Sequence, residues 1–144
     1  DNFYFVGGDF DTPNQVLAVK VSSNGTFDIS FSGDGVAKLI MAPANGNALL
    51  LDAKLDSNNN IIVAGQAEVS SVNTPMLGRI KPDGTLDSLF NSSGFFSASS
   101  CTNAAQLSSL LLLDDSNFVV AGQCYIDATF KDNIELTQYQ LLEP

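Results

Sequence analysis

The chain contains no histidine and no tryptophan, and only 6 of its 144 residues are lysine or arginine. Histidine is the one side chain that ordinarily titrates near neutral pH, so its absence removes the commonest general base and metal ligand. The 16 acidic residues leave a formal net charge of −10. A chain of this charge repels phosphate groups and anionic lipids, so we expect no nucleic-acid partner. Because histidine is absent, we also expect that the protein is not an enzyme.

Long apolar runs are also missing. The longest comprises the leucines Leu110–Leu113, against the roughly 20 apolar residues of a membrane span, so we expect no membrane insertion. Charged residues make up 15% of the chain, below the usual quarter, and Ser, Asn and Thr replace them, as suits an extracellular β-rich protein. The chain opens at Asp1 rather than Met, which indicates a processed precursor or a piece of a longer protein.

What the sequence does contain is a repeat. The short apolar phrase ending in glycine at Phe5–Gly8 returns as Ile62–Gly65 and Val119–Gly122, at a step of 57 residues both times. A second phrase, Lys20–Asp28, returns 59 residues later as Arg79–Asp87. A fixed period in this range is typical of repeat architectures, in which each unit buries its apolar face against its neighbours.

Strand signals fill the repeats, and no segment shows helical periodicity. The signals are short runs rich in β-branched and aromatic residues, bounded by Asn, Asp or Gly. Asn24–Gly25 and Asp83–Gly84 are dipeptides that accept positive φ and mark tight turns. The expected strands are Phe3–Gly8, Val16–Val21, Val36–Met41, Leu49–Leu55, Ile61–Gln66, Met76–Lys81, Phe95–Ser99, Leu107–Leu113, Phe118–Gln123 and Ile134–Gln140.

Residues 49–55 alternate with a period of two. This pattern predicts one apolar and one polar face for the strand. The apolar face comprises Leu49, Leu51, Ala53 and Leu55, and the polar face comprises Asp52 and Lys54.

Four antiparallel strands in about 57 residues predict an all-β fold of β-propeller blades. With the strands of a blade named A to D from the central axis outward, residues 1–47 supply B, C and D, residues 48–103 a full blade, and residues 104–144 A, B and C. These about 2.5 repeats cannot close a ring of four to eight blades, and their open edges are expected to pair with other chains or with further repeats. The alternative is a β-sandwich.

The turns carry a family likeness. Gly84–Phe90 is followed by Ser93–Phe95, and Gly25–Phe31 is followed by Gly33–Val36. With the Val63–Gly65 strand, these runs resemble the delta-60 repeat of bacterial secreted and surface proteins. The resemblance implies a propeller-like repeat in large extracellular proteins, with no established chemistry or ligand.

The two cysteines flank one expected hairpin. Cys101 lies just before strand A of the third blade and Cys124 just after strand B, so the hairpin brings both to the same end. We expect a disulfide, which would contribute about 3 kcal/mol by the chain-entropy estimate, and with it an oxidising compartment. The alternative is two unrelated core thiols.

Acidic turns leave calcium as a weak alternative to the expected absence of a cofactor. Asp56–Asn60 begins with oxygen side chains at alternate positions, as a calcium loop does, but Ile61 replaces the required glycine and Ala67 the bidentate glutamate. A plain hairpin turn is the favoured interpretation. A second acidic group comprises Asp9, Asp11 and Asp34.

The favoured function is a non-catalytic extracellular module, structural or interacting, that associates with copies of itself or with the remainder of a longer repeat protein. The expected assembly residues at the terminal strands are Phe3, Phe5, Ile134, Leu136 and Tyr139. The first alternative is a multi-chain propeller lectin that binds a glycan on Tyr125 and Tyr139.

A glycoside hydrolase is the second alternative. It needs two carboxyl groups about 5 to 9.5 Å apart, one with a raised pKa. The candidates Asp52, Glu68 and Asp127 fall at unrelated places in the repeat, so we rank this function last.

Overall fold

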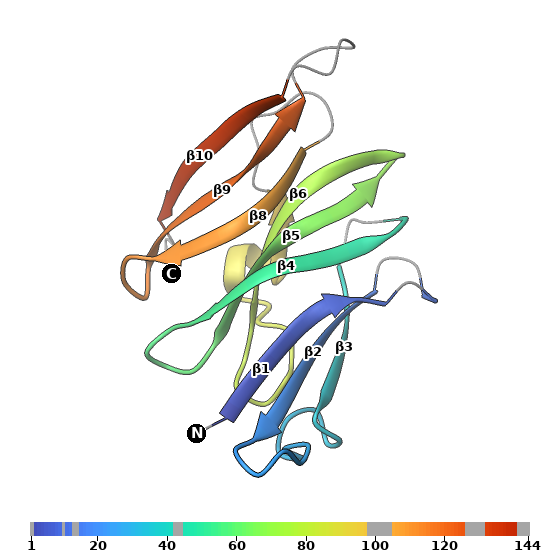
Figure 1. Ribbon diagram of the computed structural model, residues 1–144, viewed down its shortest axis with the longest axis vertical. Coiled ribbons are helices and arrows are strands. Elements are labelled where there is room, and N and C mark those ends of the chain that lie inside the picture. The colour runs from blue at the N-terminus through green and yellow to red at the C-terminus, as the bar shows by residue number, and fades with distance from the viewer. Residues whose placement is uncertain are drawn as a thin grey trace.

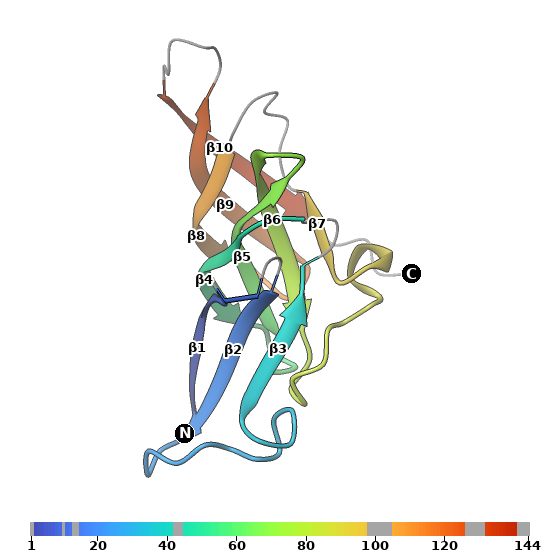
Figure 2. The same ribbon diagram turned by 90° about the vertical axis from the view of Figure 1, so that its right-hand side faces the viewer.

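The computed structural model describes residues 2–9, 11–12, 15–41, 45–97, 105–125 and 132–140, without the side chains at 125, 132–137, 139 and 140. Its strands form three antiparallel sheets that follow one another along the long axis of the molecule (Figure 1 and Figure 2). In these residues, no helix has the length and apolarity that a membrane crossing requires.

The sheets follow the order of the chain. The first has the order β1-β2-β3, with β1 at Asn2–Gly8, β2 at Gln15–Ser22 and β3 at Val36–Ile40. The second has the order β4-β5-β6-β7, with β4 at Ala48–Leu55, β5 at Ile61–Val69, β6 at Val72–Ile80 and β7 at Phe95–Ser97, and a 3-10 helix, η1, at Phe90–Ser92. The third has the order β10-β9-β8, with β8 at Ala105–Leu112, β9 at Asn117–Tyr125 and β10 at Asp132–Gln140.

These sheets are the predicted blades. Within the described residues, the first blade consists of strands B, C and D, the second of strands A to D, and the third of strands A, B and C. The prediction of an all-β, propeller-type fold is therefore confirmed. The described strands form three successive sheets, rather than the two sheets of the alternative sandwich.

The middle sheet is buried on both sides. Its strands present alternate side chains to opposite faces. Ile61 and Val63 pack against the first sheet, Ile62 and Ala64 pack towards the third, and each of the four is at most 1% exposed. We call these two clusters the first core and the second core. Burial on both faces explains why the first residues of β5 form a continuous apolar run rather than an alternating pattern.

The strand register corrects the first step of the predicted repeat. Lys20 lies opposite Tyr4 in the first sheet, and Arg79 lies opposite Ile62 in the second. Because Lys20 and Arg79 occupy the same place in the repeat, Tyr4 corresponds to Ile62, which is 58 residues further along. The predicted step of 57 is wrong for this interval.

The same register shows that Gly7, and not its successor, corresponds to Gly65. From the second blade to the third, the step of 57 is confirmed, because Leu50 pairs with Gly65 and Leu107 pairs with Gly122.

The alternation predicted for residues 49–55 is wrong at its start, because β4 contains a β-bulge. Pairing with β5 shifts between Leu50 and Asp52, so Leu51 is an extra residue on the bulged strand. Ala48 and Leu50 are each 2% exposed in the first core, whereas Leu51 is 39% exposed. An extra residue reverses the alternation of side chains between the two faces of a strand. Leu51 therefore does not lie on the same buried face as Ala53.

The bulge belongs to the repeat. In β8 the pairing shifts between Leu107 and Ser109, at the positions that correspond to Leu50 and Asp52. Leu107 is 1% exposed, like its counterpart. Strand A therefore bends at the same place in both blades where it is described.

This bend requires a glycine in strand B. A Cβ on Gly65 would overlap the carbonyl oxygen of Leu49 and would lie 2.9 Å from the Cα of Leu50. A Cβ on Gly122 would overlap the carbonyl oxygen of Gln106 in the same way. The glycine of the short phrase thus marks a close approach of two backbones.

Gly65→Ala is expected to lower the free energy of unfolding by about 1–3 kcal/mol, because the new methyl group must displace backbone atoms. Asn73→Ala, on the exposed end of β6, should change it by less than about 0.5 kcal/mol. Urea unfolding followed by circular dichroism measures both changes. Equal stability of the two variants would contradict the close approach of strand A.

Candidate functional site

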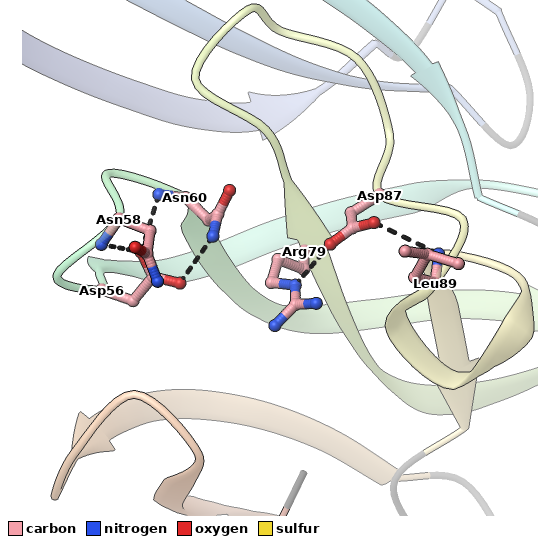
Figure 3. Close-up of polar contacts among 6 residues, drawn as sticks. All are labelled: Asp56, Asn58, Asn60, Arg79, Asp87 and Leu89. Carbon is pink, nitrogen blue, oxygen red and sulfur yellow. Dashed lines mark hydrogen bonds and ion pairs between the residues drawn. The ribbon is translucent and has the colours of Figure 1, made fainter. Parts of the chain in front are cut away.

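A buried ion pair links strand C of the second blade to the turn that follows it (Figure 3). Arg79 Nε donates to Asp87 Oδ2 at 2.6 Å, and the two side chains are 9% and 8% exposed. The guanidinium carbon of Arg79 lies 5.3 Å from the ring centre of Phe90. The backbone N–H of Leu89 donates to Asp87 Oδ1 at 3.2 Å. The pair therefore holds the turn over the buried Phe90.

The first blade contains the same arrangement. Lys20 Nζ lies 2.9 Å from Asp28 Oδ2, and 5.8 Å from the ring centre of Tyr4. Tyr4 in turn contacts the buried Phe31 edge to face, with ring centres 6.1 Å apart. The hydrogen bond from Lys20, assisted by Ser30, lowers the pKa of Asp28 to about 2, and the same bond to Asp28 raises the pKa of Lys20.

The tight turns predicted between the ion-paired residues are confirmed. Gly25 and Gly84 have φ of +84° and +87°. Asn24 and Asp83 accept the N–H of the residue two places on, at 3.1 and 2.9 Å. The motif that carries the family likeness thus serves the fold: in each of the first two repeats it places one phenylalanine, Phe31 or Phe90, in a core.

Asp87→Ala is expected to destabilise the protein by about 3–5 kcal/mol, because it leaves the buried Arg79 charge without this carboxylate. Asp28→Ala should cost less, since the Asp28 side chain is 20% exposed against 8% for Asp87. Urea unfolding at neutral pH compares the two. A larger effect at Asp28 would contradict the difference in burial.

The ion pair of the first blade should make stability depend on acid. The folded pKa of Asp28, about 2, lies below the ordinary 3.8, so the unfolded chain takes up this proton first as the pH falls. The contribution of Asp28 ionisation to the free energy of unfolding is complete above the ordinary pKa and is lost as the pH falls towards 2. Asp28→Asn is expected to lose less Tm than the wild type between pH 4 and pH 2 in scanning calorimetry. Parallel losses would contradict this assignment.

The polar turn Asp56–Asn60 is organised by Asp56 itself (Figure 3). Its Oδ1 accepts the N–H of Asn58 at 2.9 Å and of Asn60 at 2.8 Å, and its Oδ2 accepts the Asn60 side-chain amide at 2.8 Å. Both oxygens thus make the bonds expected of a hairpin turn. Across the described residues, no three His, Cys, Asp or Glu side chains gather where they could hold a metal ion. The expected absence of a cofactor, with calcium as its weak alternative, stays a prediction.

Asp9, Asp11 and Asp34 do not form the acidic group that their sequence suggested. Asp9 follows β1 and donates its N–H to the carbonyl of Gln15. Gln15 lies opposite Ile40, the last residue of β3, so Asp9 is near the end of that strand. Asp34 precedes β3, at the opposite end of the same sheet. Each carboxylate acts locally, because Asp9 accepts the N–H of Asp11 at 3.1 Å and Asp34 that of Val36 at 2.8 Å.

Two carboxylates tie the second blade to the third. Asp52 Oδ2 accepts the N–H of Leu110 at 2.8 Å, next to the bulge of β8. Asp115 accepts the N–H of Ser57 at 2.8 Å and also its hydroxyl. The hydrogen bonds from Ser57 lower the pKa of Asp115. Both acids are therefore parts of a blade interface.

The geometry does not favour the glycosidase arrangement. Burial raises the pKa of Asp52, but the hydrogen bonds from Lys54 and from two backbone N–H groups outweigh it, and the net pKa lies below the ordinary value. Glu68 lies four residues along β5 from Ala64, the residue opposite Asp52, a distance of about 13 Å along the strand. Asp127 lies outside the described residues.

Two further predictions depend on residues outside the described parts. Cys124 lies opposite Ala105 in the third sheet, but Cys101 is outside the described residues, so the disulfide stays a prediction. Tyr125 ends β9, and Tyr139 lies opposite Phe118 in β10. Their side chains are not described, and glycan binding also stays a prediction.

The outward side of the first sheet is apolar, and we call it the head face. Phe3 and Phe5 are 55% and 60% exposed there, as expected for assembly residues. By register they correspond to Ile61 and Val63, which are 1% and 0% exposed against a neighbouring blade. Sequence reasoning missed the other members of this face. They can be identified only from the strand pairing, because residues that lie directly opposite each other share a face of the sheet. They include Leu17, Val19, Val21 and Phe27, and on β3 Val36, Lys38 and the 51% exposed Ile40.

The third sheet has a matching outward side, the tail face. Leu111 is 57% exposed and lies opposite the half-buried Val119. The same face includes Ala121, and Leu136 of β10 lies opposite it in the register. Ile134 lies opposite Gln123. The terminal strands named from the sequence thus belong to the two end sheets.

Comparison with known families gives one match. Residues 57–90 match the model described as domain of unknown function (DUF5122) beta-propeller. The matched segment runs from the turn before β5 to the buried Phe90, and therefore includes the ion pair and its turn. It supports a propeller-like repeat family. Comparisons with curated proteins and with solved structures return no match.

Proposed function

We propose that the chain is a non-catalytic β-propeller building block in which the head face of one copy packs on the tail face of another. The observation that carries this proposal is the exposure of Phe3 and Phe5. Their counterparts in the second and third blades are Ile61, Val63, Phe118 and Val120, and each is at most 1% exposed against the preceding blade. The same positions on the head face present two phenylalanines to solvent.

The occupant proposed for the head face is a second copy, because the chain already makes this contact twice. In each of the two cores, one sheet contributes the side that corresponds to the tail face. The next sheet along the chain contributes the side that corresponds to the head face. At the tail face, Val119 and Ala121 correspond to Ile62 and Ala64, which pack towards the third blade. A third contact of the same kind would bury both end faces.

A head face and a tail face are different surfaces, so their contact builds either a closed ring or an open fibre. Each copy contributes three sheets, and two copies contribute six, within the four to eight blades of closed propellers. We infer that a ring of two copies is the smallest closed assembly.

Two further features support a binding or structural role over catalysis, in a secreted or surface protein of a bacterium. Among the described residues, every carboxyl group whose pKa is shifted has a lowered pKa, whereas a general acid near neutral pH needs a raised one. These groups are Asp28, Asp52, Asp83, Asp114 and Asp115. The polar, weakly charged composition and the delta-60 likeness support the location.

Replacing both phenylalanines of the head face is expected to abolish association. In sedimentation velocity, the wild type should reach about 30 kDa, twice its 15.2 kDa mass, and Phe3→Ser/Phe5→Ser should remain at the smaller mass. The reason is the loss of two large apolar side chains, each about 1.5–3 kcal/mol when buried. A wild type that stays at the single-chain mass at high concentration would overturn the proposal.

Ile29→Ser provides a matched control. Ile29 is 73% exposed, more than either phenylalanine. Its counterpart Ser88 is exposed in the middle blade, which has a neighbour on each side. The position therefore lies outside the repeated contact, and Ile29→Ser should associate as the wild type does.

A further inference from the structure

The edge of β1 that faces away from β2 has no strand beside it in the described part of the chain. In the second blade, strand B lies between β4 and β6, and in the third it lies between β8 and β10. β1 is the corresponding strand and pairs only with β2. Its seven residues include no charge and no proline, the features with which proteins protect a free edge from pairing.

Gly7 provides a second, independent observation. It corresponds to Gly65 and Gly122, which lie under the carbonyl oxygens of strand A. A Cβ on Gly7 would meet no atom within 4 Å, and its φ is not in the left-handed region. Glycine inside a strand costs stability unless another backbone comes close or the conformation requires it. Neither reason exists within the described chain.

We propose that the free edge of β1 binds an extended strand of type A, antiparallel to β1, whose bulge lies over Gly7. The occupant is a segment other than the ten described strands, because β4 and β8 are already paired. Its chemistry follows from what these two strands share, which is the pattern Ala-x-Leu-x-x-(Ala/Leu)-x-Leu.

The register of the bound strand follows from the second blade. Leu50 lies opposite Gly65, so the leucine at the third position of the pattern would lie opposite Gly7. The sixth and eighth positions, occupied by Ala53 and Leu55 in β4, would lie opposite Phe5 and Phe3. The added strand would complete the first blade.

This inference rests on the proposed role of the terminal blades in assembly, and names the chemistry that one edge accepts. It can be tested separately, because Gly7 contributes no side chain to the head face. Association of copies depends on the phenylalanines, whereas strand binding depends on the space over Gly7.

The probe is a fluorescein-labelled peptide with the sequence of residues 48–55, followed by fluorescence anisotropy. We expect saturable binding to the wild type, and at least tenfold weaker binding to Gly7→Ala, whose methyl group would overlap the peptide backbone. Gly7→Ala should keep its Tm within about 2 °C of the wild type, since nothing in the folded chain occupies that space. Lys38→Gln, an exposed change on β3, should bind as the wild type does.

A fusion provides a second measurement that does not depend on free peptide affinity. A copy of residues 48–59 placed directly ahead of Asn2 reproduces the spacing between strands A and B of the second blade, at high effective concentration. The fusion should raise Tm, and Gly7→Ala within it should remove the gain. Equal peptide binding to the wild type and Gly7→Ala would overturn the inference, as would no binding together with no gain in Tm. Peptide binding by a protein whose copies do not associate would overturn the proposed function alone.

Discussion

A sheet with two apolar faces is stable only between two neighbours, and this requirement organises the molecule. The middle blade meets it fully, with Ile61 and Val63 buried on one side and Ile62 and Ala64 on the other. In the described part of the chain, the end blades meet it on one side only. Burial of a large apolar side chain stabilises by about 1.5–3 kcal/mol, so an uncovered face with several such residues has a strong tendency to acquire a partner. The proposed assembly would therefore follow from the same packing that forms the fold.

The turn motif and the ion pair serve that packing. Arg79 and Asp87, like Lys20 and Asp28 in the first blade, hold a turn whose phenylalanine enters a core. A buried ion pair adds little net stability over an apolar replacement, because desolvation of both charges offsets their attraction. Its role here is positional, since it fixes where the chain crosses from strand C to strand D. A recurring acidic motif thus has a structural explanation that needs no ligand.

The order of the strands could be predicted from the sequence, because turn residues separate the apolar strand segments in each repeat. The bulge could not, since an extra residue such as Leu51 reverses the alternation without any local sign in composition. The first repeat step failed for a related reason: two adjacent glycines offered two alignments, and only strand pairing selects Gly7. Phe3 and Phe5 could be named as exposed assembly residues from their terminal strand, but the residues beside them on the head face, such as Val19, could be found only from the strand pairing. Asp9 and Asp34 were grouped by charge, while the register places them at opposite ends of one sheet.

Burial of the middle sheet on both sides has a consequence for how the chain opens. Among the described strands, the main contacts between sheets link neighbours in the stack, so the free energy of local opening follows position along the stack rather than distance from a single centre. Backbone amides of β5 can exchange with solvent only after both cores separate, whereas β1 and β10 open after one core separates. Fluctuations are therefore expected to begin at the ends and move inward, so the two faces proposed for assembly are also those that rearrange most easily.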